Sequence, residues 1–309
     1  MKHYRAVVLS PHLDDAVFSC AGAIRRLRQE GPVLVINIFT RYLATSTLKH
    51  GVPLVDSRHD EERAAAAFLD YESVNLDELD AAFRREHYAQ ISNIFRAVND
   101  EDMRWLPALR ERIEAVLKDI EFDTLLVPLG IGWHVDHVLT FLAMQPRWTQ
   151  RGVEFYEDVP YCGIPYSASY RMRQVGSVAA GAPGTAHNGA AGDSGAWLRA
   201  IDNYRHTPIM RKLAPWIVRV MAVPAVAVYF WRLLRANQVG DAQVPALRLA
   251  PCFEAIDDGF AAKVSAMQLY TSQFKEFYHS GEECAMALRD YAATVSPGVS
   301  AERRWTLSA

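Results

Sequence analysis

Apolar residues in the first half of the chain gather in short runs that alternate with longer stretches of helical spacing. Strands are predicted at residues 4–9, 33–39, 73–76 and 124–128. Helices are predicted at residues 16–30, 58–69, 88–98 and 102–118. The nearly continuous β-branched run at 33–39 is typical of a parallel strand that is covered on both faces. The pattern therefore predicts an α/β fold, with a mostly parallel sheet, right-handed crossovers and helices on both faces.

The second half of the chain has a different pattern. A strand at 153–156 and a helical region at 260–278 are predicted, and a glycine-rich loop at 181–195 and a very apolar segment at 213–234 lie between them. We expect residues 1–152 to form a catalytic core. Residues 153–309 are expected to continue the same domain as a C-terminal elaboration of helices and loops that sets specificity.

The apolar segment at residues 213–234 has more than one interpretation. Aromatic and aliphatic side chains at helical spacing usually form buried surface, either in the core or at a homo-oligomer interface. Trp216, Trp231 and nearby arginines such as Arg219 would also suit a helix at a membrane surface. In that case the substrate could carry an acyl chain.

Composition and charge narrow the class of protein. The 309 residues are 50% apolar, enough for a sizeable core, and the net charge of −3 lacks the basic excess that nucleic-acid binding needs. The four cysteines are scattered without metal-binding spacing, which favours reduced thiols in a cytoplasmic protein. The chain opens with a predicted strand, so no secretory signal is expected, and it contains no uninterrupted 18-residue apolar run. We expect a cytoplasmic protein, with peripheral membrane contact only if residues 213–234 lie at a membrane surface.

Two polar clusters follow predicted strands. His12, Asp14 and Asp15 come directly after the first strand, and His134, Asp136 and His137 come after the strand at 124–128. Ligands in open α/β sheets bind at the carboxyl ends of the strands, so both clusters should face one crevice. The sequence predicts a divalent metal centre there.

A catalytic zinc ion takes three protein ligands and leaves one position open. His12, Asp15 and His137 supply such a set from two loops. Asp14 is not in this ligand set and would be free to act as general base on a coordinated water. The metal makes that water easier to deprotonate by lowering its pKa to about 7 in favourable cases.

The remaining polar residues of the second cluster have candidate roles as well. His134 and His137 are one helical turn apart and share a face. His134 could therefore reach the substrate as an acid or oxyanion partner, and Asp136 could orient an imidazole from behind.

The motifs resemble those of a known family. Residues 12–15, His-Leu-Asp-Asp, are similar to the His-Pro-Asp-Asp-Glu signature of the PIG-L/LmbE-like zinc-dependent de-N-acetylases, and residues 134–137, His-Val-Asp-His, to their His-x-Asp-His signature. Arg58 and Glu61 resemble the family's Arg-x-x-Glu, and residues 263–273 weakly resemble a C-terminal Lys-x-x-Ala…Ser-Gln element. Leu13 and Ala16 depart from the first signature, but neither is a ligand.

The resemblance implies a Rossmann-like fold and assigns roles to the two clusters. Its zinc ligands are His12, Asp15 and His137, with Fe²⁺ as the alternative metal. Asp14 is the implied general base, His134 the general acid or oxyanion stabiliser, and Asp136 the group that tunes His134. These roles agree with those that the residue chemistry suggests.

Residues further along the chain are candidates for substrate binding. The resemblance points Arg58 to the pocket, although a solvated arginine at a helix start is an equal alternative. Glu157, Asp158 and Tyr161 follow a predicted strand and could wall the pocket with groups suited to sugar hydroxyls, or could form an ordinary acidic turn.

We therefore expect a metal-dependent hydrolase that removes the acetyl group from an N-acetylated amino-sugar conjugate, a small-molecule glycoconjugate such as an N-acetylglucosamine derivative. An apolar aglycone is compatible with the segment at 213–234. The alternatives are an amide or ester hydrolase for a non-sugar secondary metabolite and a non-catalytic relic of the fold. A nucleotide-binding protein is disfavoured because no glycine-rich phosphate-binding motif follows a strand.

Overall fold

The fold is built on a single seven-stranded sheet, seen in a computed structural model that describes residues 1–42, 57–96, 98–164, 167–176, 228, 247–296 and 298–308. The strand order is β3-β2-β1-β4-β5-β7-β6. The strands are β1 (Lys2–Ser10), β2 (Val33–Asn37), β3 (Glu72–Asn75), β4 (Ile120–Pro128), β5 (Val153–Tyr156), β6 (Leu249–Ala255) and β7 (Ala301–Leu307). β1 to β5 pair in parallel and β7 is antiparallel to both of its neighbours, which confirms the predicted mostly parallel α/β sheet.

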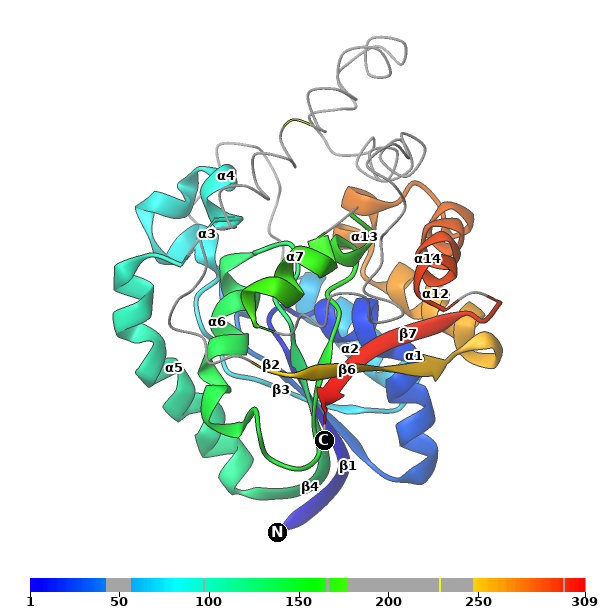
Figure 1. Ribbon diagram of the computed structural model, residues 1–309, viewed down its shortest axis with the longest axis horizontal. Coiled ribbons are helices and arrows are strands. Elements are labelled where there is room, and N and C mark those ends of the chain that lie inside the picture. The colour runs from blue at the N-terminus through cyan, green and yellow to red at the C-terminus, as the bar shows by residue number, and fades with distance from the viewer. Residues whose placement is uncertain are drawn as a thin grey trace.

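Helices cover both faces of the sheet (Figure 1). The longer ones are α1 (Asp15–Glu30), α2 (Ser57–Leu69), α5 (Asp100–Lys118), α6 (Val135–Ala143), α12 (Phe260–Leu269) and α14 (Gly281–Val295). The shorter ones are α3 (Ala81–Arg84), α4 (Ile91–Ile94), α7 (Ser167–Gln174) and α13 (Thr271–Phe277). α5 and α6 pack together on one face, and α1, α2, α12 and α14 pack on the other.

Burial explains why these segments take these forms. Residues 6–9 of β1 and 33–37 of β2 are all buried, as expected for central strands with helices on both sides. All nine residues of α6 are buried, whereas α5 buries one stripe, formed by Leu106, Leu109, Ile113 and Leu117, and exposes its opposite face. α5 begins at Asn99, whose side chain accepts a hydrogen bond from the Asp102 backbone N–H at 2.8 Å.

The structure differs from the sequence prediction between residues 81 and 98. In place of one helix at 88–98 there are short helical pieces, α3, α4 and a 3₁₀ turn at Glu86–Ala89, because Arg85 and Gln90 have extended backbones. Contacts with α5 hold this path: Arg84, Arg85 and Tyr88 all donate to the Asp102 carboxylate. Such tertiary contacts override local helical spacing.

The C-terminal half contains elements that the sequence pattern did not predict. The helical region at 260–278 is two helices, α12 and α13, which meet at Tyr270. α7, α14, β6 and β7 were not predicted. β5, β7 and β6 extend the sheet that begins with β1 to β4, so strands from both halves of the chain share one sheet.

Two predicted features lie outside the described residues, the glycine-rich loop at 181–195 and, apart from Val228, the apolar segment at 213–234. Both remain predictions. Within the described ranges, no helix combines the length and apolar character that crossing a membrane requires.

Candidate metal centre

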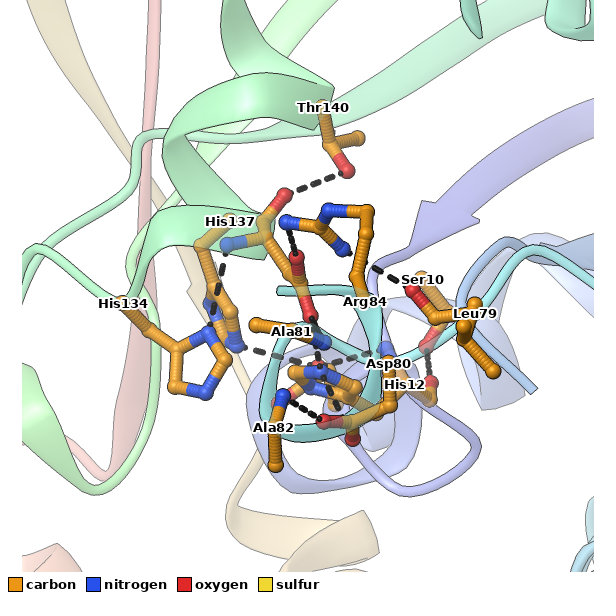
Figure 2. A network of polar contacts seen from close by, with 12 residues as sticks. Ser10, His12, Leu79, Asp80, Ala81, Ala82, Arg84, His134, His137 and Thr140 are labelled. Carbon is orange, nitrogen blue, oxygen red and sulfur yellow. Dashed lines mark hydrogen bonds and ion pairs between the residues drawn. The ribbon is translucent and has the colours of Figure 1, made fainter. Parts of the chain in front are cut away.

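The two polar clusters meet where β1 and β4 end, as the sequence predicted. His12 lies in the turn between β1 and α1, and His137 lies in the first turn of α6. Their imidazole rings are 5.4 Å apart between centroids, and both residues are buried. Figure 2 shows His12 near His134 and His137, with Asp80 and Ala81 beside them.

Asp15 lies between the two imidazoles. Its Oδ2 atom is 3.0 Å from His12 Nδ1 and 3.2 Å from His137 Nε2. Ligands of one tetrahedral zinc ion with bonds of 2.0–2.1 Å are about 3.3 Å apart, so each of these two distances suits a pair of ligands of one cation. Burial alone would raise the pKa of Asp15, but the adjacent His137 and His12 rings hold it well below its ordinary value. Asp15 therefore contacts both His12 and His137, and the role of these three residues as metal ligands stays a prediction.

The turn that carries His12 and Asp15 is stabilised by its own hydrogen bonds. Asp15 Oδ2 accepts from the His12 backbone N–H at 2.8 Å. Ser10 Oγ accepts from the Ala16 N–H at 2.9 Å and donates to the His12 carbonyl. Neither Leu13 nor Ala16, the two departures from the family signature, disrupts this turn.

Asp158 fixes the orientation of His137. Its Oδ1 atom is 2.7 Å from His137 Nδ1, and its Oδ2 atom accepts from the Ile131 N–H at 2.8 Å. The bond to Nδ1 leaves Nε2 facing Asp15, an arrangement that carboxylate-bound histidine ligands of metals commonly have. Asp158, predicted to bind substrate, is thus placed behind His137.

His134 caps the N-terminus of α6. Its Nδ1 atom accepts from the Asp136 backbone N–H at 3.3 Å, so the proton of the neutral ring is assigned to Nε2. Burial, together with the charges of His12 and His137, lowers the pKa of His134 well below its ordinary value. A neutral imidazole with a proton on Nε2 can donate a hydrogen bond to developing negative charge.

The Asp136 side chain contacts His12, while its negative charge opposes the lowering of the His134 pKa, so its implied role in tuning His134 stays a prediction. Its Oδ2 atom is 3.1 Å from His12 Nε2 and accepts from the Ala81 N–H at 3.0 Å. Its Oδ1 atom forms an ion pair of 2.7 Å with Arg84. Asp136 is the second residue after His134, the N-cap of α6. Its backbone N–H donates to His134, while its side chain extends toward α3.

A cavity of about 100 Å³ opens onto these groups. Its lining residues are His12, Asp14, Asp15, Phe18, Arg58, Asp80, His134, His137, Val159, Pro160, Tyr161, Gln273 and Phe277. Asp14 therefore faces the cavity beside the donor set, and burial together with the charge of Asp15 raises its pKa. Arg58 and Tyr161 line the cavity, as the sequence predicted, and Arg58 donates to the Tyr42 hydroxyl at 2.7 Å.

Glu157, like Asp158, is a predicted substrate-binding residue that does not line this cavity. Its carboxylate accepts hydrogen bonds from Arg303 and Trp305 and lines a different, smaller cavity of about 30 Å³. Asp80, in contrast, lines the first cavity although sequence reasoning missed it. Asp80 is the N-cap of α3, and nothing in its sequence distinguishes it from an ordinary capping aspartate.

In the described part of the chain, His12, Asp15 and His137 are not one of the groups whose donor atoms all lie within 4.8 Å of one another, but His12 belongs to two such groups. Among the described residues, His12, His134 and His137 form one group that could hold a metal ion, and His12, Asp80 and Asp136 form another. The donor atoms of each group lie within 4.8 Å of one another. The structure therefore contains histidine and aspartate side chains that could together hold a metal ion.

Known proteins are similar to this chain in sequence. The family model described as PIG-L, GlcNAc-PI de-N-acetylase, matches residues 7–146, a range that includes both polar clusters. Over this range the chain is similar to the PIG-L family. A relative from Streptomyces fradiae, 2'-N-acetylparomamine deacetylase, is 27% identical over 172 residues, which are 53% of this chain and 60% of the relative.

Solved structures share the fold of this chain. The A40926 pseudoaglycone deacetylase Dbv21 has a TM-score of 0.60 at 20% identity, with 98% of this chain and 97% of that chain covered. The zinc-inhibited form of teicoplanin deacetylase Orf2 has a TM-score of 0.61 at 17% identity, with 98% of each chain covered. At these identities the likeness establishes the fold alone.

Proposed function

We propose that this chain is a metal-dependent N-deacetylase that hydrolyses the acetamido group of an amino-sugar conjugate. One observation carries most of the proposal: Asp158 holds His137 so that Nε2 faces the Asp15 carboxylate, which also contacts His12. This arrangement supports metal binding in a cavity that also contains a spare carboxylate, Asp14.

The metal is proposed to be Zn²⁺, held by His12, Asp15 and His137. Two imidazoles and one carboxylate suit zinc, although Fe²⁺ accepts the same donors. When bound, the ion supplies Lewis-acid chemistry: it polarises a carbonyl group and makes water easier to deprotonate.

Asp14 and His134 are proposed to carry out the proton transfer and charge stabilisation. Asp14 takes a proton from the water that attacks the amide carbon, and the His134 Nε2–H donates a hydrogen bond to the resulting oxyanion. When the C–N bond breaks, Asp14 returns the proton to the departing nitrogen. The products are acetic acid and the free amine, which exchange a proton to give acetate and an ammonium group, so atoms and charge balance.

The other cavity residues are proposed to bind the sugar. The guanidinium of Arg58 and the carboxylate of Asp80 can pair with hydroxyl groups, and Tyr161 and Phe277 offer aromatic surface for an apolar sugar face. A cavity of about 100 Å³ is smaller than a typical ligand site, so it suits the acetamido end of a larger conjugate. The Streptomyces relative is named for an N-acetylated amino sugar, which supports this substrate class.

Residues 153–309 are proposed to belong to the same domain and to set specificity. They supply β5, β6 and β7 of the common sheet and also Tyr161, Gln273 and Phe277 of the cavity.

The proposal is tested by hydrolysis of defined substrates. The zinc-loaded protein is incubated with 2'-N-acetylparomamine, N-acetylglucosamine and an N-acetylglucosamine glycoside, and acetate and primary amine are both quantified. Equal amounts of both products from at least one substrate, absent with Asp14→Asn, are expected. A zinc-loaded protein that releases acetate from simple esters but from no N-acetylated amino sugar would overturn the proposal.

A further inference from the structure

A second buried network begins one residue before Asp158. Glu157 is 4% exposed and follows β5 directly. Its Oε1 atom accepts from Arg303 Nε at 2.7 Å and from Trp305 Nε1 at 2.9 Å, and its Oε2 atom accepts from the Tyr291 hydroxyl. A buried carboxylate with this many donors is held firmly in place.

The pairing of β7 with β5 places Arg303 beside Glu157. Tyr156 lies opposite Arg304 in this antiparallel pair, so the residue before Arg304 falls next to the residue after Tyr156. The Arg303 guanidinium also lies over the Trp305 ring, 4.9 Å from its centroid, and donates to the Tyr291 hydroxyl at 3.1 Å. Strand β7 therefore holds the Arg303 guanidinium in place beside Glu157 at the end of β5.

The backbone at residues 157–159 is anchored from three directions. Glu157 is held by β7 and α14, and Asp158 contacts His137 and the Ile131 N–H. The Val159 N–H donates to Ser19 Oγ of α1 at 3.1 Å. Consecutive side chains thus point to different parts of the molecule, and one of them reaches the metal centre.

We propose that Arg303 is a positioning residue for the metal centre. By holding Glu157, Arg303 fixes the backbone from which Asp158 orients the His137 ring toward Asp15. The inference rests on the proposed function, because it concerns the same centre. It assigns a role in metal binding to a strand that lies outside the matched range 7–146.

The neighbouring arginine supplies a matched control. Arg304 is 7% exposed against 5% for Arg303, and it also forms ion pairs, at 2.6 Å with Glu154 and at 2.8 Å with Glu254. Successive side chains of a strand point to opposite faces. Loss of Arg304 should therefore disturb a comparable ion-pair network without affecting the loop that carries Asp158.

The test measures Co²⁺ binding by wild type, Arg303→Met and Arg304→Met. Affinity is obtained by competition with a chromophoric chelator, and the visible spectrum of the Co²⁺-loaded protein reports ligand geometry. Arg303→Met should weaken Co²⁺ binding by about 10- to 100-fold, as loss of outer-shell support commonly does, and should alter the spectrum. Arg304→Met should bind with near wild-type affinity and spectrum.

Glu157→Gln provides a milder second variant if Arg303→Met does not fold, because the amide keeps the side-chain shape while losing the charge. Weaker Co²⁺ binding by folded Glu157→Gln would also support the proposal. Wild-type affinity and spectrum in folded Arg303→Met or Glu157→Gln would overturn it, as would an equal loss in Arg304→Met. A wild-type protein that takes up no Co²⁺ would instead overturn the proposed function, and this inference with it.

Discussion

Asp14 and Asp15 are adjacent carboxylates with different surroundings. Asp15 contacts both His12 and His137, whereas Asp14 lines the cavity where a substrate would bind. Asp14→Asn keeps the side-chain shape but cannot accept a proton, so kcat should fall by about 10² to 10⁴-fold. Zinc content should remain one per chain, as measured by elemental analysis. Undiminished turnover in zinc-loaded Asp14→Asn would show that another group is the base.

His137 makes metal binding depend on pH. Burial alone would lower the pKa of His137, but the carboxylates of Asp15 and Asp158 raise it to about 9. Below pH 9 the metal-free site therefore carries a proton that a divalent cation must displace. Affinity for Co²⁺ should rise with pH between 6 and 8, by about tenfold per pH unit for each displaced proton. Titrations in non-coordinating buffers measure this slope, and a flat profile would contradict it.

The sequence predicted the residues of the centre better than their contacts. His12, Asp15 and His137 could be proposed because they follow apolar strands in a recognisable order, and the structure places them together. The different directions of Glu157 and Asp158 could not be predicted, since they depend on how β5 pairs with β7. The contact of Asp136 with His12 depends on the position of α3, which local spacing does not reveal.

At the scale of elements, α2 supports one wall of the cavity through Glu61. Glu61 Oε1 accepts from the Thr271 hydroxyl at 2.8 Å and the Ser272 N–H at 2.9 Å, and Oε2 accepts from the Ser272 hydroxyl at 2.7 Å. These bonds hold the first turn of α13, which carries Gln273 of the cavity. The resemblance of Arg58 and Glu61 to the family's Arg-x-x-Glu thus has a physical basis, because both side chains serve the same cavity.

Glu61→Ala should free the start of α13. Because hydrogen bonds to a charged, buried acceptor are lost, the free energy of unfolding should fall by about 1–3 kcal/mol, measured by urea denaturation. KM for the deacetylation substrate should rise more than kcat falls, since Gln273 lies in the binding cavity and not in the donor set. Glu61→Gln, which keeps an acceptor oxygen, should show a smaller effect on both quantities. Equal stability and KM in Glu61→Ala and wild type would contradict this role.

The loop between β4 and α6 shows how tightly the elements fit. Gly130 and Gly132 have positive φ angles of 73° and 90°. A Cβ atom on Gly132 would lie 2.5 Å from the Tyr161 ring, so only glycine allows this approach. The sequence predicted the flanking strand and the two histidines, but not this contact.

Elements with strong local patterns were predicted and those defined by tertiary contacts were not. β1, β2 and α1 could be predicted because their apolar runs are long and buried throughout. The segment at 81–98 could not, because contacts of Arg84, Arg85 and Tyr88 with Asp102 decide its path. β6 and β7 carry charged residues that pair with each other and with β5, so they lack the apolar pattern of a central strand.

At the scale of the whole molecule, a metal ion would join loops from distant parts of the chain. His12 and Asp15 follow β1, and His137 begins the helix after β4. A ligand that binds only the folded state adds stability, about 2.7 kcal/mol at a free concentration of 100 times Kd. Chelation should therefore lower Tm, and Zn²⁺ should restore it, in thermal unfolding monitored by circular dichroism. The double variant His12→Ala/His137→Ala should show no such response, and an identical response in that variant would contradict it.

The location of the metal tests the account most directly. Anomalous diffraction from a crystal of the zinc-loaded protein, collected on both sides of the zinc edge, gives the position of the ion without reference to activity. We predict one zinc peak per chain, bounded by His12, Asp15 and His137, with Asp158 on the far side of the His137 ring. A zinc peak held by Asp80 and Asp136, without Asp15 and His137 as ligands, would contradict the proposed centre.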